Sequence, residues 1–172
     1  MTLLDRVSAL LNQRAIPHAL IDAAALAAAG VSRSTYDLDL LTGDARVLLP
    51  ETWQGLRDLG VSVDTRRGDA EDPLGGVVRL EQTGERPVDV ILARHGWQTR
   101  IIDRAQRPPG GPPIVSPPDL VLLKLYAGGT QDVWDIRELL RLPEGEGWTA
   151  AVEAELVTLP QFMQDGWARI RH

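Results

Sequence analysis

The sequence predicts an α+β fold in which a mixed, mostly antiparallel sheet of about four or five strands is flanked by helices and followed by C-terminal helices. Three observations lead to this prediction. Apolar residues recur at helical spacing near the N-terminus, short apolar runs follow in the middle of the chain, and helical spacing returns after a proline-rich stretch. At 172 residues the chain suits one domain, or one domain with a small appendage.

The N-terminal part predicts helices and strands in alternation. Leucine and valine side chains at helical spacing predict a helix over residues 2–14, and a short buried strand is expected over residues 18–21. The alanine-rich segment that starts at Asp22 favours a second helix, which ends at Gly30. A strand over residues 36–41 should follow it.

The middle of the chain predicts a short helix and three more strands. Pro50 with an acid beside it matches a helix start, which predicts a helix over residues 50–59. Residues 83–86 read as a hairpin turn. Strands are expected over residues 61–63, 77–82 and 87–93. We expect strands 18–21, 36–41 and 87–93 to share one sheet.

A stretch rich in proline and glycine, residues 107–118, divides the chain because it cannot form regular structure. It predicts a core of residues 1–106, a connection, and a helical part over residues 119–172 that packs on the core. In that part, helices are expected from Ser116 to Gly128, from Thr130 onward, and over residues 149–171 with a break at Pro160.

Composition excludes several kinds of site. Lys and Arg number 18 against 24 Asp and Glu, so a wide basic face for nucleic acid is not expected. The chain has no cysteine, which excludes a disulfide framework, a thiolate zinc site and a cysteine nucleophile. Residues 1–14 do not resemble a signal peptide, and no apolar run approaches membrane-spanning length. We therefore expect a cytoplasmic protein with no membrane partner.

Two carboxylates, Asp37 and Asp39, stand one residue apart in the apolar run 36–41. Strand side chains alternate between faces, so both should point the same way, roughly 6 to 7 Å apart. At that spacing they can share a divalent cation such as Mg²⁺. The alternative is a strand end that faces water, since short motifs also match by accident. Asp89, among the apolar residues of 87–93, is the third carboxylate candidate.

The order of these features resembles the nucleotidyltransferase superfamily of the DNA polymerase β type. The shared features are a strand–helix turn at residues 21–23, then Gly30, Arg33, Thr35 and the two acids, and finally a distal strand acid. More narrowly, the chain resembles the small bacterial abortive-infection, type IV toxin nucleotidyltransferases. The resemblance covers roughly residues 3–142 and is best over residues 24–41.

In that family a D-x-D pair and a third strand acid bind magnesium, and the third acid prepares the attacking hydroxyl. The resemblance therefore implies that Asp37, Asp39 and Asp89 are catalytic and metal-binding, with Mg²⁺ as cofactor and an NTP as co-substrate. It implies transfer of NMP to a hydroxyl of an RNA, a protein or a small molecule. A tRNA or a protein is a candidate acceptor, and an antitoxin is a candidate partner.

The resemblance also implies four nucleotide-binding residues: Ala23 at the strand–helix turn, Arg33, Thr35 and Lys124. A guanidinium and a hydroxyl just before the D-x-D can bind phosphates. The alternatives are a loop arginine and a strand-start threonine. Lys124 resembles a lysine that contacts phosphate, and its alternative is a lysine that snorkels from an apolar helix.

One departure from the family favours a different function. Asp22-Ala23 stands where these enzymes have Gly-Gly or Gly-Ser against the triphosphate. Glycine allows close approach of the backbone to phosphate, whereas an aspartate brings a negative charge. As a helix N-cap, Asp22 would contribute about 1 kcal/mol. A nucleotidyltransferase fold that has lost catalysis and serves as a binding or regulatory module is therefore the alternative, and the sequence leaves open whether the protein is an enzyme.

Two other enzyme classes also use D-x-D at a strand. Phosphatases of the haloacid dehalogenase type have Thr or Val two residues after the second acid, where this chain has Leu41. Metal-dependent glycosyltransferases have a glycine-rich nucleotide-sugar site before the motif, and this chain has no such site there. Both classes rank behind the nucleotidyltransferases.

Overall fold

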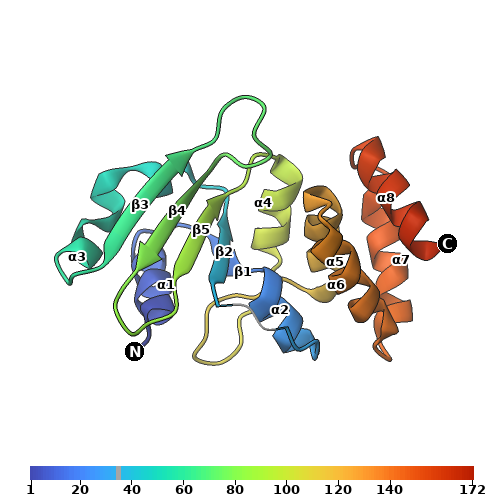
Figure 1. Ribbon diagram of the computed structural model, residues 1–172, viewed down its shortest axis with the longest axis horizontal. Coiled ribbons are helices and arrows are strands. Elements are labelled where there is room, and N and C mark those ends of the chain that lie inside the picture. The colour runs from blue at the N-terminus through green and yellow to red at the C-terminus, as the bar shows by residue number, and fades with distance from the viewer. Residues whose placement is uncertain (34–35) are drawn as a thin grey trace. The chain divides into compact units, whose positions relative to one another are not determined.

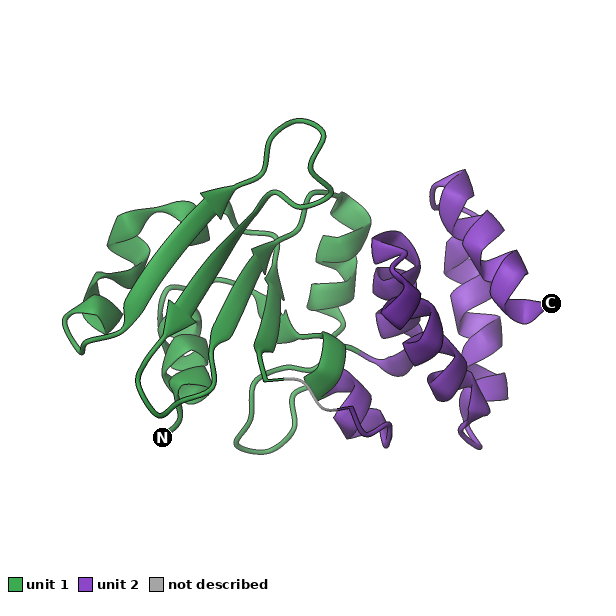
Figure 2. Cartoon of the chain, in the orientation of Figure 1, with its two compact units in different colours: residues 1–24, 34–115 green, residues 25–33, 116–172 purple. Residues whose placement is uncertain are grey.

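The computed structural model describes residues 1–33 and 36–172 (Figure 1). These residues form two compact units (Figure 2). Unit 1 comprises residues 1–24 and 34–115, and unit 2 comprises residues 25–33 and 116–172. Helix α2 (Asp22–Ala29) begins in unit 1 and ends in unit 2.

Unit 1 is built on a mixed five-stranded sheet with the order β1-β2-β5-β4-β3. The strands are β1 (His18–Leu20), β2 (Leu38–Thr42), β3 (Ser62–Arg67), β4 (Gly76–Glu81) and β5 (Val88–Leu92). Strands β2 and β5 pair in parallel, and the other three pairings are antiparallel. The predicted α+β class and the shared sheet of β1, β2 and β5 are therefore confirmed.

Helices and helical turns complete unit 1. They are α1 (Leu3–Gln13), the 3-10 turns η1 (Ala45–Leu48) and η2 (Pro50–Trp53), α3 (Gln54–Arg57) and α4 (Gly96–Asp103). Two predictions need correction. The helix expected over residues 50–59 is a 3-10 turn followed by a single α-helical turn. Strand β3 extends through Arg67, beyond the predicted strand 61–63, because its residues pair with β4 although most of their side chains are exposed.

One face of the sheet is apolar and forms the core of unit 1. The strand residues Leu40, Val78, Val88 and Val90 are fully buried there, and side chains of α1 belong to the same cluster. Alternation along each strand sends the next residue to the other face. Trp53 is also buried, and its indole N–H donates to the Val47 carbonyl oxygen at 2.7 Å, so its polar atom is satisfied.

Unit 2 consists of helices (Figure 2). Besides the end of α2, they are α5 (Pro117–Ala127), α6 (Thr130–Arg141), α7 (Gly145–Leu156) and α8 (Gln161–Arg171). The predicted signals explain their ends: the Ser116 hydroxyl accepts from the Asp119 amide at the start of α5, and Gly128, with φ of 69°, ends it. Pro160 separates α7 from α8 as predicted, although α7 begins earlier than expected.

Within the described part of the chain, no helix combines the length and the apolar character needed to cross a membrane.

His18 is a titratable side chain in the interior of unit 1. Its imidazole lies 2.7 Å from the Ser8 hydroxyl through Nε2 and 3.0 Å from the Ile16 carbonyl oxygen through Nδ1. The carbonyl can only accept, so Nδ1–H donates and Nε2 accepts from the hydroxyl. Burial lowers the pKa of His18 from its ordinary value of 6.5, and the positive charge of Arg107 lowers it further.

This shift makes stability depend on pH in one direction. Below pH 6.5 the unfolded chain binds a proton at residue 18 that the folded chain resists, so the free energy of unfolding falls as the pH falls. We expect the free energy of unfolding, measured by urea denaturation, to be lower at pH 5.5 than at pH 7.5. His18→Gln should lose this part of the pH dependence, and His172→Gln, at the exposed C-terminus, should keep it. Equal slopes in all three proteins would contradict the assignment.

Candidate functional site

A row of charged residues crosses the second face of the sheet in unit 1. Asp39 on β2 lies opposite Asp89 on β5, Asp89 lies opposite Arg79 on β4, and Arg79 lies opposite Asp64 on β3. Residues directly opposite each other in adjacent strands share a face. The pairing therefore brings two of the three predicted acids side by side.

Arg79 joins the third predicted acid to this row. Its Nη1 donates to Asp89 Oδ2 at 2.9 Å and to Asp37 Oδ2 at 3.2 Å, and its Nε donates to Glu81 Oε1 at 3.0 Å. Both aspartate oxygens thus lie near one nitrogen atom. Asp37 precedes β2, which begins two residues later than the predicted strand 36–41. The hydrogen bonds that Arg79 donates to Glu81 and to Asp37 raise the pKa of Arg79 above its usual value, so the group stays cationic.

Asp89 is the most enclosed member of this contact, with its side chain 16% exposed. Burial raises the pKa of Asp89 above its ordinary value, the Arg79 charge opposes this effect, and the Asp37 charge adds to it. Its Oδ2 accepts a hydrogen bond from Arg79. Its Oδ1 is buried and has no hydrogen-bond partner in the described residues. An acceptor in this state retains the capacity to bind a donor or a cation.

The donor chemistry of the three aspartates suits Mg²⁺, which prefers carboxylate oxygens. Their arrangement does not. Among the described residues, no three His, Cys, Asp or Glu side chains are grouped so that they could hold a metal ion. Arg79 occupies Oδ2 of Asp37 and of Asp89 instead. The site as it stands balances its negative charge with a guanidinium.

The strand–helix turn lies next to Asp39. The Ile21 amide donates to the Asp39 carbonyl oxygen at 3.0 Å, and α2 begins at the following residue, Asp22. Asp22 has φ of 50°, in the left-handed region that glycine adopts freely and that aspartate tolerates better than most residues. The turn therefore keeps a backbone conformation that suits glycine while carrying a carboxylate. Ala23 follows it and is buried.

Arg33 and Lys124 lie in unit 2, where both form ion pairs with Asp135. Lys124 Nζ is 2.6 Å from Asp135 Oδ2 and 3.1 Å from Asp132 Oδ1, and Arg33 Nη1 is 2.9 Å from Asp135 Oδ2. The side chains of Lys124 and Asp135 are 3% and 0% exposed. The snorkelling lysine offered as the alternative is therefore wrong, because the ammonium is buried in an ion-pair network. Thr35 lies outside the described residues.

Sequence reasoning did not identify Arg79 and Glu81 as site residues. A signal for Arg79 was present, because Arg79 and Asp89 stand equally far from Gly84 in the predicted hairpin. Opposite residues of a hairpin share a face, so equal spacing places the arginine against the acid. The contact with Asp37 carries no such signal, since that residue belongs to a segment far away in the chain.

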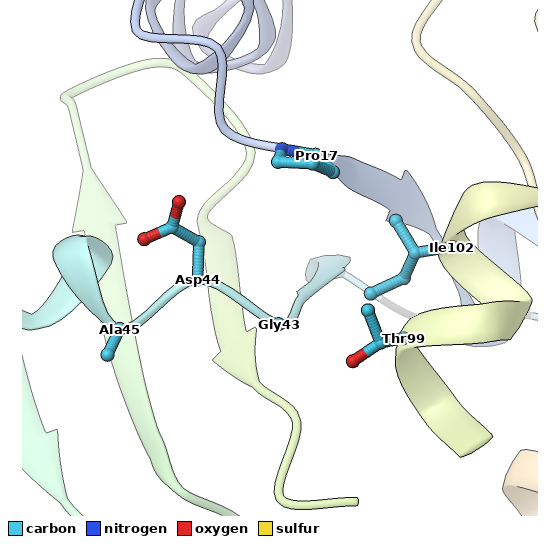
Figure 3. A pocket seen from close by; sticks show the side chains of 6 residues that line it. All are labelled: Pro17, Gly43, Asp44, Ala45, Thr99 and Ile102. Atoms are coloured by element: carbon cyan, nitrogen blue, oxygen red, sulfur yellow. The ribbon is translucent and has the colours of Figure 1, made fainter. Parts of the chain in front are cut away.

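A separate cavity of about 340 Å³ lies at the far end of β2 in unit 1. Thr99 and Ile102 of α4 face Pro17 and Gly43 across it (Figure 3). Gly43 follows the last residue of β2, whereas Asp37 precedes the first. The cavity is therefore distinct from the charged row.

Comparison with known proteins finds no family model that matches the chain. A bifunctional protein of tRNA 5-methylaminomethyl-2-thiouridine biosynthesis from Paracidovorax citrulli is 37% identical over 72 residues. This match covers 37% of the chain and 11% of that protein, so the chain spans about a tenth of the length of this curated relative.

The chain is similar to three solved structures of nucleotidyltransferases or nucleotidyltransferase-like proteins. The crystal structure of ANT(2'')-Ia with adenylyl-2''-tobramycin matches with a TM-score of 0.49 at 16% identity, over 98% of this chain and 95% of that one. An antigenic nucleotidyltransferase-like protein from Paracoccidioides brasiliensis gives 0.45 at 16% identity, over 94% and 90%. Terminal uridylyl transferase 4 from Trypanosoma brucei with bound GTP gives 0.41 at 14% identity, over 80% and 47%.

These are proteins of the superfamily that the sequence motifs resemble. The identities are 14–16% and the TM-scores lie below 0.5, so these similarities assign no function to the chain.

The buried network of unit 2 predicts a stability effect. Asp135→Asn removes the charge that faces Lys124 and Arg33, and breaking a buried ion pair costs about 3–5 kcal/mol. Glu138→Gln is the matched control on the same helix, because its partner Arg141 is 72% exposed, and we expect a loss of about 0–1 kcal/mol. Denaturant unfolding measures both values. Equal losses in the two variants would show that the network is not structural.

Proposed function

We propose that the chain is a metal-dependent nucleotidyltransferase-like protein that transfers NMP from an NTP to a hydroxyl group of an RNA, a protein or a small molecule. One observation supports this most strongly. Asp39 and Asp89 stand directly opposite each other on parallel strands, and Asp37 and Asp89 share one nitrogen of Arg79. Strand pairing links Asp39 to Asp89, and Arg79 links Asp89 to Asp37, which supports the catalytic role that the resemblance assigns to these three positions.

In the proposed reaction, the acceptor hydroxyl oxygen bonds to the α-phosphorus of the NTP. The bond from that phosphorus to the bridging oxygen breaks, and pyrophosphate leaves. The hydroxyl proton passes to a carboxylate, which the resemblance assigns to Asp89. Such a reaction depends mainly on positioning and on neutralisation of phosphate charge. Dependence on magnesium is part of the proposal, because all three side chains are carboxylates.

Of the four residues proposed to bind the nucleotide, Arg33 and Lys124 have the weakest support. Both are engaged with Asp135 inside unit 2. Ala23 lies at the turn beside Asp39, where the resemblance expects the triphosphate. A tRNA or protein acceptor, an antitoxin partner and a cytoplasmic location belong to the same proposal and are supported by the resemblance alone.

A second candidate is a nucleotidyltransferase-like module that binds or regulates without catalysis. The carboxylate of Asp22 at the turn and the guanidinium of Arg79 on the acids favour it. A negative charge near the start of α2 would oppose a triphosphate there. This candidate expects weak nucleotide binding or none.

Isothermal titration with each NTP, in Mg²⁺ and in EDTA, tests the proposal. We expect saturable binding of at least one NTP that requires Mg²⁺, and Asp39→Asn should abolish it because the substitution removes an anionic oxygen from the converging acids. Asp64→Asn is the matched control, since Asp64 belongs to the same charged row but its side chain is largely exposed at the edge strand. It should bind as the wild type does.

The Asp22 turn provides the test between the two candidates. Restoring the family pattern with Asp22→Gly and Ala23→Ser should strengthen NTP binding, because it removes a negative charge where the triphosphate is expected. Tight Mg²⁺-dependent binding by the wild type would reject the degenerate module. Absence of binding in both proteins would reject the enzyme.

A further inference from the structure

The guanidinium of Arg79 holds the oxygens that a divalent cation would need. Its Nη1 contacts Oδ2 of Asp37 and Oδ2 of Asp89, and its Nη2 lies 3.3 Å from Asp37 Oδ2. Both oxygens are within 3.2 Å of one nitrogen, so they are separated by less than twice that distance. Hard cations bind carboxylate oxygens at about 2.0–2.6 Å, so a cation on these oxygens would lie within a few ångströms of the guanidinium, and the two positive charges would repel each other.

Strand register determines the position of Arg79. The residue lies within β4, opposite Asp89 on one side and Asp64 on the other, so its side chain must leave the sheet beside the acids. Glu81, two residues further along the same face, holds its Nε at 3.0 Å. The contact with the acids is therefore built into the hairpin of β4 and β5.

The charges around Arg79 do not cancel. One guanidinium contacts three carboxylates, those of Asp37, Glu81 and Asp89. Asp39 adds another acid in the adjacent strand position. The buried Oδ1 of Asp89 has no hydrogen-bond partner in the described residues. The four acids thus outnumber the two cations, Arg79 and Arg66, whose charges act on Asp89. The open Oδ1 of Asp89 lies beside Arg79, and both features favour exchange with a second cation.

We propose that Arg79 and a divalent cation compete for Asp37 and Asp89, so that Arg79 determines whether the acids hold a metal. In one state the guanidinium bridges the two acids and the metal site does not form. In the other, Arg79 turns away and Mg²⁺ or Mn²⁺ takes the oxygens together with Asp39. This inference rests on the proposed function, because it concerns the metal on which transfer would depend.

Titration with Mn²⁺ alone, without nucleotide, tests the competition. Arg79→Gln should bind Mn²⁺ at least about tenfold more tightly than the wild type, because it removes a positive charge a few ångströms from the ligand oxygens. Arg66→Gln is the matched control: Arg66 lies on the same face of β3, but its side chain is 75% exposed and pairs with Asp64. Its effect should stay below about threefold. Adding Asp89→Asn to Arg79→Gln should remove the gain.

Equal Mn²⁺ affinity in the wild type and in a folded Arg79→Gln variant would overturn the inference. If that variant does not fold, the inference is tested on the wild type by NMR of the arginine Nε–Hε signals. Added Mg²⁺ should shift the signal of Arg79, which is assigned by its loss in Arg79→Lys. A signal that stays unchanged at saturating Mg²⁺ would also overturn the inference.

These outcomes separate the inference from the proposed function. Tighter Mn²⁺ binding by Arg79→Gln without NTP binding by any form would support the competition and reject the nucleotidyltransferase. Mg²⁺-dependent NTP binding by the wild type without a gain of Mn²⁺ affinity in Arg79→Gln would support the function and reject the competition.

Discussion

The parallel pairing of β2 with β5 is the constraint on which the candidate site depends. It sets Asp39 opposite Asp89, and the antiparallel pairing of β5 with β4 then sets Arg79 beside both acids. A slip of one residue would send these charges into the apolar core on the other face. Burial of residues such as Leu40, at the alternate positions of the same strands, therefore holds the acids on one side of the sheet.

Each unit places a basic side chain between acids, but the two arrangements differ in burial. Lys124 and Asp135 are buried, so loss of either partner would leave the other as an unpaired buried charge, and this pair serves stability. Arg79 and Asp37 are partly exposed, so water can replace either partner at a small cost. Arg79 in unit 1 can thus be exchanged for another cation. The acids that it contacts are those to which the resemblance assigns catalysis.

Much of the fold was predictable because local signals reinforce one another. Leucine spacing in residues 2–14, the alanine-rich segment and the Ser116 cap each predict an element that the structure contains. Two segments were not predicted. Residues 64–67 extend β3 beyond the predicted strand 61–63 through backbone pairing with β4, although most of their side chains are exposed. No element was predicted for residues 94–106, where α4 forms. In both cases tertiary contacts stabilise a segment whose own pattern is weak.

The sequence by itself determined that Asp39 and Asp89 are strand acids that point away from their apolar neighbours, because residue alternation is a local property of a strand. Only the tertiary structure decided which residues the charged side chains contact. Arg79 donates to Asp37 from a strand far away in the chain, and Arg33 and Lys124 both pair with Asp135. Local periodicity specifies the direction of a side chain, whereas its partner depends on which strands and helices become neighbours when the chain folds.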